Sequence, residues 1–323
     1  MTSAQRTPRA APTVSIVMPC YNAMQTIEAS IESVLAQSMN DWELLVVDDG
    51  STDSSWHLIT DIAGTDPRIR VVSQRNAGPS AARNLGVSRA RGRIIAFLDS
   101  DDIWQTGHLA THCRKLGERS DLGISFSASL FIDEAGNRTG EGTRIPSRPL
   151  EIGDLLAGNP TGTCSALVFK RDVYETAGPM RGDMVHAEDQ EWLIRVLHAG
   201  WRIECAPETP ILYRISRYSL SSSVDKMLEG WHCVIEHARE RFPEQVEREC
   251  TRALARMHLY FARRSVRSMR DRHAGFQHIS TALSRDPRLP LHSPGNLLAT
   301  IAVCAFPDTT RNFRSLISGN RHV

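Results

Sequence analysis

The sequence predicts an α/β protein: a mixed sheet with helices on both faces, followed by a helical appendage. Over the first hundred residues, continuous apolar runs alternate with helical patterns, which is typical of a parallel sheet buried on both faces. After the serine-rich segment 219–223 the strand patterns stop, while helical periodicity continues. We therefore expect a disordered tail at 1–12, an α/β domain at 13–222 and a helical appendage at 223–323.

Short β-branched and apolar runs predict the first four strands, in "VSIVMP", "WELLVVDD", "IRVVSQ" and "GRIIAFLD". The intervening segments "AMQTIEASIESVLAQS", "SSWHLITDIAG" and "GPSAARNLGVSRA" have helical patterns. In the first of these segments, Ile27, Ile31, Val34 and Leu35 recur at helical spacing. Parallel strands need such crossover helices, so the alternation predicts a parallel arrangement.

From about residue 120 the pattern changes, and the core is expected to continue to about residue 222 as a mixed sheet. "DLGISFSASLFIDEAGN" predicts a strand that enters a turn, and "CSALVFKRDVYETAG" predicts a strand followed by a helix. "AEDQEWLIRVLHAGWRIECAPE" predicts a helix, a glycine stop and another strand. In the appendage, one helical face is predicted from Met227, Leu228, Trp231, Val234 and Ile235.

Composition narrows the possible classes of protein. Hydrophobic residues make up 41% and charged residues 23% of the chain, as in soluble globular proteins. The net charge of +1 gives no electrostatic signal for nucleic acid, so no nucleic-acid partner is expected. The seven scattered cysteines form no CxxC pair, which argues against a zinc site and favours a reducing compartment. The same cysteine pattern leads us to expect a cytoplasmic protein. The longest apolar run, "NLLATIAVCAFP", is too short to span a bilayer and is expected to form a buried helix.

Polar clusters follow three of the predicted strands. Tyr21 and Asn22 follow the first strand, Asp48 and Asp49 end the second, and the run from Asp99 to Asp102 follows the fourth. The carboxyl ends of parallel strands lie at the same edge of a sheet, where ligands bind in such folds. We therefore expect these clusters to converge on one crevice.

The third cluster crowds three carboxylates, those of Asp99, Asp101 and Asp102, into four residues. Their repulsion is relieved by protonation, by a paired cation or by a divalent metal ion. Two carboxylates spaced i, i+2 after a strand would address both a hard cation and phosphate oxygens. An Asp-rich turn that caps a helix starting near Ile103 explains the cluster equally well, and the cluster alone leaves both interpretations open.

Four motifs occur in order within residues 14–104: "VSIVMPCYNA", "WELLVVDDGSTD", "RNAGPSAARNLGV" and "GRIIAFLDSDDIW". "AEDQEW" at 187–192 and, more weakly, "YRISRYSLS" at 213–221 extend the set. In these motifs the chain resembles the family 2 glycosyltransferases, inverting enzymes with the GT-A fold. The resemblance implies a nucleotide-sugar donor, foremost a UDP-sugar, a glycan or lipid-linked saccharide acceptor, and Mn²⁺ or Mg²⁺ as cofactor.

The resemblance assigns the donor-binding residues. The nucleotide pocket would be lined by Pro19, Tyr21 (whose ring would lie beside the base) and Asn22. Asp48 or Asp49 would accept a hydrogen bond from the uracil or ribose, and which of the two does so stays open. The nucleotide would further be flanked by Asn76, Gly78 and Arg83. Arg83 is equally well explained as an ion-pair partner of the Asp99–Asp102 cluster.

The same resemblance makes Asp99, Ser100 and Asp101 the DxD element. Asp99 would face the ribose or the metal ion, and Asp101 would ligate the metal ion on the diphosphate. Asp102 is expected to cap the next helix, and Asp53 to start the helix after "DDGSTD".

Inversion by direct displacement needs a base to take the proton of the acceptor hydroxyl. Glu188 and Asp189 match the family's ED pair, which makes Asp189 the base and Glu188 a neighbour or acceptor contact. On "ED" alone, acids in the first turn of a helix are the preferred explanation. Trp192 is expected in the core or in a wall of the acceptor site.

One departure from the family pattern concerns the metal site. Family members often carry a histidine where this chain has Ser216. A serine hydroxyl is a poor metal ligand compared with imidazole, so Arg214 and Arg217 are the candidate replacements as fixed cations on the diphosphate.

Three other functions agree less well with the sequence. A non-catalytic scaffold subunit would not need the intact DxD and ED pairs. A Rossmann dehydrogenase would need GxGxxG where the chain has "PCYNAM", and a phosphatase would carry its DxD after the first strand.

An arginine-rich stretch predicts either a solvated helix face or peripheral contact with the inner face of the cell membrane. This basic stretch contains Arg263, Arg264, Arg267, Arg270 and Arg272.

Overall fold

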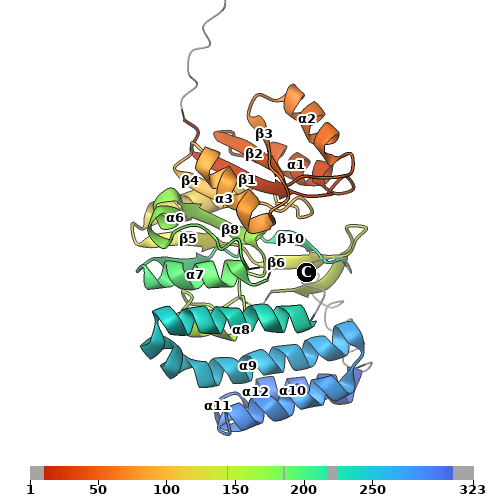
Figure 1. Cartoon of the computed structure of the whole chain (residues 1–323), viewed down its shortest axis with the longest axis vertical. Helices are drawn as coiled ribbons and strands as arrows, with labels where there is room; N and C mark the ends of the chain where they lie inside the picture. The colour runs from red at the N-terminus through yellow and green to blue at the C-terminus, as the bar shows by residue number, and fades with distance from the viewer. Residues whose placement is uncertain (1–10, 144, 185, 217–223, 308–323) are drawn as a thin grey trace, which may run out of the picture. The chain divides into compact units, whose positions relative to one another are not determined.

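The computed structural model describes residues 11–143, 145–184, 186–216 and 224–307 (Figure 1). Packing divides the chain into two compact units built from interleaved segments, and each is described by itself. The first unit runs to Ala128 and includes Cys164–Gly182 and Ile203–Tyr213; the second contains Ser129–Thr163, Asp183–Arg202 and the chain from Arg214 on. The predicted domain boundary at 222/223 lies outside the described residues and stays a prediction, as does the tail, of which only residues 11 and 12 are described.

Within the described residues, the first unit is built on a seven-stranded sheet of order β3-β2-β1-β4-β8-β5-β9. Strands β3, β2, β1 and β4 are parallel, while β8 is antiparallel to both β4 and β5. The predicted mixed sheet is therefore confirmed. The strands are β1 Val14–Cys20, β2 Trp42–Asp48, β3 Ile69–Ser73, β4 Ile94–Phe97, β5 Leu122–Phe126, β8 Leu167–Lys170 and β9 Arg202–Cys205.

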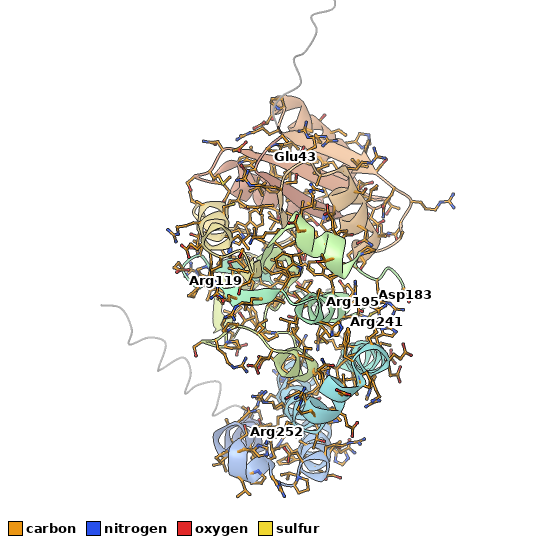
Figure 2. All side chains as sticks on the ribbon, turned by 90° about the vertical axis from the view of Figure 1, so that its left-hand side faces the viewer. Glu43, Arg119, Asp183, Arg195, Arg241 and Arg252 are labelled. Atoms are coloured by element: carbon orange, nitrogen blue, oxygen red, sulfur yellow. The ribbon has the colours of Figure 1, made fainter. Side chains whose placement is uncertain are left out.

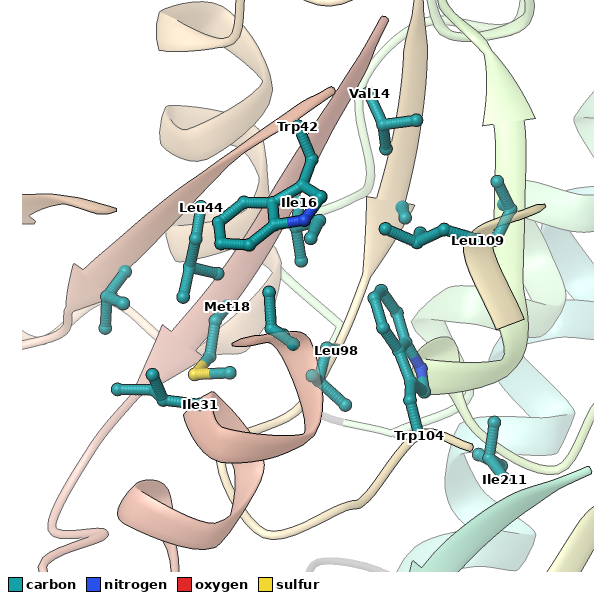
Figure 3. Close-up of a cluster of buried hydrophobic side chains, with 14 of the residues drawn as sticks. Val14, Ile16, Met18, Ile31, Trp42, Leu44, Leu98, Trp104, Leu109 and Ile211 are labelled. Atoms are coloured by element: carbon teal, nitrogen blue, oxygen red, sulfur yellow. The ribbon is translucent and has the colours of Figure 1, made fainter. Parts of the chain in front are cut away.

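Strand β1 is buried in the core of the first unit. Alternate residues of β1, namely Val14, Ile16 and Met18, are fully buried on one face of the sheet, as the two-residue period of a strand requires (Figure 3). Trp42 and Leu44 of β2 join the same cluster. Val17, on the other face of the strand, is also fully buried, so β1 is covered on both faces, as its continuous apolar run predicts.

Most of the helices of the first unit lie where the sequence predicts them. They are α1 Ile27–Leu35, α2 Ser55–Thr65, α3 Pro79–Arg89, α4 His108–Glu118 and α6 Arg171–Ala177, with the 3-10 turn η1 Cys164–Ala166 before β8. Strand β10, Ile211–Arg214, ends where the second unit resumes.

The prediction that the next helix starts near Ile103 is wrong. The backbone N–H and C=O of Ile103 both bond to Leu212, at 3.0 and 2.9 Å, in an isolated antiparallel bridge. This pairing holds the chain extended, so α4 begins only at His108, with Gly107 as its N-cap. Asp102 is fully buried and does not cap that helix.

The second unit combines a β-hairpin with helices. The hairpin is β6 Ser129–Ile132 and β7 Arg138–Gly142. The helices are α5 Ile152–Ala157, α7 Glu188–His198, α8 Val224–Arg241, α9 Pro243–Met269, α10 Arg272–Arg285, α11 Leu289–His292 and α12 Pro294–Ala305. "NLLATIAVCAFP" is thus a partly buried helix, as predicted, and no helix of the described residues is long and apolar enough to cross a membrane.

The C-terminal helices pack against the helix that carries the ED pair. Trp231, Val234 and Ile235 of α8 are buried, which confirms the predicted apolar face at these positions. The indole N–H of Trp231 donates to the carbonyl of Leu156 in α5 at 2.7 Å. A Cβ on Gly230 would lie only 2.8 Å from the carbonyl oxygen of His186, two residues before α7. Helices predicted as an appendage are therefore in close contact with the segment that leads into Glu188.

Two arginines of the basic stretch hold α12. Arg263 donates to the side chains of Asn296 and Thr300, at 2.8 and 2.5 Å. Arg272 donates to the carbonyl oxygens of Cys304 and Ala305, at 3.0 and 2.8 Å, and so satisfies the last turn of that helix. Membrane contact by the basic stretch stays a prediction.

Candidate functional site

The polar clusters of the first unit lie together at the carboxyl ends of the strands. Cys20 of β1 is in register with Asp48 of β2, and the N–H of Asp49 donates to the Cys20 carbonyl at 2.8 Å. The side-chain oxygen of Asn22 accepts the N–H of Thr52 at 2.8 Å. Asn22 adopts a left-handed conformation (φ +49°), which it tolerates better than most residues. The predicted convergence of the first two clusters is confirmed.

The two neighbouring acids after β2 have different surroundings. Asp49 accepts hydrogen bonds from the Gln74 side chain at 2.7 Å and from the N–H groups of Ala77 and Gly78 at 2.9 Å. It therefore shapes the loop that carries Asn76 and opens α3, where Gly78 supplies the required positive φ of +88°. Asp48 is 4% exposed, and its Oδ1 has no hydrogen-bond partner within the described part of the chain.

Cys20, beside Asp48, is a protonated thiol at neutral pH. Burial, reinforced by the negative charge of Asp48, raises the pKa of Cys20 to about 11. Only the thiolate is a strong nucleophile, so this cysteine has a structural role at the strand end.

Arg83 forms an ion pair with Asp99, the first acid of the third polar cluster. The guanidinium Nη2 lies 2.5 Å from Asp99 Oδ1, and the two side chains are 6% and 23% exposed. The backbone N–H of Asp99 donates to the Ser165 hydroxyl at 2.9 Å. The predicted ion pair is thus confirmed, and it relieves part of the charge crowding. A role of Arg83 in donor binding stays a prediction.

Asp101 is half-buried and lies two residues beyond Asp99. Among the described residues, no group of three or more His, Cys, Asp or Glu side chains is arranged to hold a metal ion. Mg²⁺ and Mn²⁺ are often held by one or two carboxylates, with phosphate oxygens and water completing the shell. Asp99 and Asp101 provide the one or two carboxylates that such an ion takes from a protein.

In the second unit, Glu188 and Asp189 open α7. Ala187 precedes them in a left-handed conformation (φ +60°) as the N-cap. Asp189 accepts the N–H of Gln190 on Oδ1 at 2.7 Å and the side-chain amide of Asn159 on Oδ2 at 2.6 Å. Both acids lie in the first turn, as the helix interpretation predicts; their catalytic roles stay predictions.

The rest of α7 anchors these acids. Trp192 is fully buried and therefore belongs to the core. Arg195, labelled in Figure 2, pairs with Glu191 one turn earlier at 2.8 Å, and both side chains are buried. The helix that presents Asp189 is thus fixed by its own buried face.

Asn159 is a residue that the sequence reasoning missed. "NPTG" has asparagine first, proline second and glycine fourth, which is the signature of a type I turn. This pattern is typical of a turn, but the contact of Asn159 with a residue 30 positions away cannot be read from it.

The segment around Ser216 contacts the β6–β7 hairpin. Arg214 donates to the carbonyl oxygens of Asp133 and Glu134 at 3.2 and 3.0 Å. The Ser216 hydroxyl donates to the Glu134 carboxylate at 3.2 Å. Arg214 therefore supports the hairpin turn, and its predicted diphosphate contact is untested; Arg217 lies outside the described residues.

The sequence of this chain is similar to those of known glycosyltransferases. The model of the family "Glycosyl transferase family 2" matches residues 15–178. The putative teichuronic acid biosynthesis glycosyltransferase TuaG of Bacillus subtilis is 31% identical over 66% of this chain and 82% of its own length. The UDP-Glc:alpha-D-GlcNAc-diphosphoundecaprenol beta-1,3-glucosyltransferase WfgD of Escherichia coli is 34% identical over 67% of this chain and 82% of its own. The putative glycosyltransferase EpsH of B. subtilis is 32% identical, and the match spans 65% of its length.

Solved structures show the same fold. TarS 1-349 of S. aureus in complex with UDP-GlcNAc superposes with a TM-score of 0.62 at 18% identity, over 84% of this chain and 79% of that one. The mannosyltransferase PcManGT of Pyrobaculum calidifontis, in complex with GDP-Man and Mn²⁺, superposes with a TM-score of 0.60 at 18% identity. The match covers 93% of this chain and 89% of that one. The predicted GT-A fold is confirmed.

Proposed function

This chain belongs to glycosyl transferase family 2, and we propose that it transfers a sugar with inversion from a nucleotide-sugar donor to a hydroxyl group. The observation that carries the proposal is the acid cluster at the carboxyl end of β4, where the buried Arg83 holds Asp99 and Asp101 follows. The donor is foremost a UDP-sugar. UDP-GlcNAc bound to TarS and UDP-Glc in the name of WfgD support this choice.

The proposed donor pocket lies over the strand ends of the first unit. The Tyr21 side chain is 51% exposed, so its ring is accessible to a nucleobase. Asp49 holds the loop with Asn76 and Gly78, whose position at the start of α3 favours negatively charged groups. The pocket is completed by Pro19, Asn22 and Asp48, with Arg83, Asp99, Ser100 and Asp101 beside the diphosphate.

Asp99 and Asp101 would hold a divalent cation. When bound, Mn²⁺ or Mg²⁺ supplies a Lewis acid for the charge on the departing diphosphate. Arg83 would hold Asp99 in a fixed orientation, because the buried guanidinium contacts the carboxylate directly.

On the acceptor side, Asp189 acts as the base and Glu188 as a neighbouring acceptor contact. Asp189 takes the proton of the acceptor hydroxyl while that oxygen forms the glycosidic bond to the anomeric carbon. The bond from the anomeric carbon to the diphosphate breaks in the same displacement, and the electron pair leaves with the diphosphate.

Donor turnover with Mn²⁺ tests the base assignment. Asp189→Asn removes the proton acceptor and should lower the rate about 100-fold to 10,000-fold. Asp172→Asn is the matched control, because Asp172 is an exposed acid in the first turn of α6; it should turn over at the wild-type rate. Equal rates for wild type and Asp189→Asn would remove Asp189 from the mechanism. Nucleotide binding without turnover of any donor and acceptor would favour the scaffold function.

The acceptor is proposed to be a glycan or a lipid-linked saccharide, for which the name of WfgD is the support. A lipid-linked acceptor would bring the protein to the membrane, and exposed parts of the basic stretch, such as Arg270, would then contact anionic lipid. Failure to sediment with anionic liposomes at physiological salt would refute that contact.

A further inference from the structure

The side chain of Asn159 is locked by the turn that it begins. Its carbonyl oxygen accepts the N–H of Gly162 at 3.3 Å. Its side-chain oxygen accepts both the N–H and the hydroxyl of Thr161, at 3.0 and 2.7 Å. Two donors on one oxygen fix the orientation of the amide, so its NH₂ group points away from the turn.

That NH₂ group donates to Asp189. The distance from Asn159 Nδ2 to Asp189 Oδ2 is 2.6 Å, which is short, as expected for a hydrogen bond to a carboxylate. The other oxygen of Asp189 accepts the N–H of Gln190. These two bonds, one to each carboxylate oxygen, fix the orientation of the group.

The loop that carries Asn159 is itself anchored. Leu155 and Leu156 of α5 are fully buried. The carbonyl of Leu155 accepts the side-chain amide of Gln190 in α7, and that of Leu156 accepts the indole N–H of Trp231 in α8. The end of α5 is therefore fixed from two helices before Asn159 reaches Asp189, which is the preorganisation that a precise site requires.

From these contacts we propose that Asn159 is the positioning residue for Asp189. An amide donor fixes the direction of the carboxylate that it contacts and stabilises its ionised form. The inference rests on the proposed function, in which Asp189 is the base.

Two substitutions separate this role from support of the turn. Asn159→Ala removes both the turn oxygen and the donor to Asp189. Asn159→Asp keeps an oxygen for Thr161 but replaces the donor by a second carboxylate. Asn40→Ala is the matched control, because Asn40 is exposed and contacts Arg68 at the opposite end of β2.

The measurement is kcat and kcat/KM against pH with saturating Mn²⁺. Asn159→Ala should lower kcat about 10-fold to 100-fold, as expected for a lost hydrogen bond to a charged group, with an unchanged KM for the donor. The acid limb of the profile should move up by about one pH unit in Asn159→Ala and further in Asn159→Asp, where like charges oppose ionisation. Asn40→Ala should match wild type.

A purely structural role predicts a different result. Both Asn159 variants would then have a lower melting temperature, while the acid limb of the pH profile stays at the wild-type pH. That result would overturn the inference. In an Asp189→Asn background, Asn159→Ala should cost no further turnover; a further loss of equal factor would also overturn it. Full turnover by Asp189→Asn would overturn the base assignment itself. An inactive Asp189→Asn with unmoved Asn159 profiles would overturn the positioning role alone.

Discussion

Asp99 in the first unit and Asp189 in the second are held by different chemistry. A buried guanidinium contacts Asp99, whereas a side-chain amide donates to Asp189. A permanent cation would suit a carboxylate that is proposed to lie beside a diphosphate and a metal ion. The amide donor would orient the carboxylate that is proposed to take the acceptor proton. The contrast supports the proposal that donor binding and proton acceptance are separate tasks, with their residues in different units.

The largest predicted effect is the loss of turnover on substitution of Asp101, which is proposed to share the metal ion with Asp99. Asp101→Asn removes a proposed metal ligand and should lower turnover at least about 100-fold, with a higher Mn²⁺ concentration needed for half-maximal rate. The measurement is a Mn²⁺ titration of donor turnover. Asp61→Asn, an exposed acid on α2, is the control and should give the wild-type titration. An unchanged titration for Asp101→Asn would exclude it as a ligand.

A smaller effect is expected from the ion pair. Arg83→Met keeps much of the side-chain volume but leaves Asp99 without its guanidinium, and should destabilise the fold by about 2 to 3 kcal/mol. Arg119→Met at the exposed pair with Asp121 is the control, and its melting temperature should stay near wild type. Denaturant unfolding of both variants measures the difference. Equal stability of Arg83→Met and wild type would show that the pair does not hold the site.

The smallest predicted effect is the pH dependence of stability that the buried His112 gives the first unit. Burial, and next the charge of Lys115, lower the pKa of His112 to about 3. The folded state therefore holds this histidine neutral, and its contribution to stability is complete above about pH 6.5 and lost as the pH falls toward 3. At pH 5 the loss is about 2 kcal/mol.

Unfolding of wild type and His112→Asn between pH 5 and 8 checks this expectation. The variant should be less stable at pH 8, because His112 bonds both Ser125 and Ser127, but its stability should fall less steeply with acid. His57→Asn, at an exposed histidine of α2, should keep the wild-type slope. An identical slope for His112→Asn would contradict the account.

Local patterns predicted the sheet and the acids at its edge, because strand periodicity and the common edge of parallel strands are local and geometric facts. They could not predict that Ile103 pairs with Leu212, which delays α4, since that bond joins residues far apart in the chain. Nor could they assign Asp49 to the loop with Gly78, or Asn159 to Asp189. Such polar partners depend on which side chains folding brings within 3 Å.

The most direct test of separate tasks is the thermal stabilisation by UDP with Mn²⁺, measured for wild type, Asp101→Asn and Asp189→Asn. A ligand that binds only the folded state stabilises it by RT ln(1 + [L]/Kd), so weaker binding gives a smaller shift. We predict that Asp189→Asn keeps the full wild-type shift while its turnover is lost, and that Asp101→Asn loses most of the shift. Loss of the shift in Asp189→Asn, or no shift in wild type at millimolar UDP, would contradict the account.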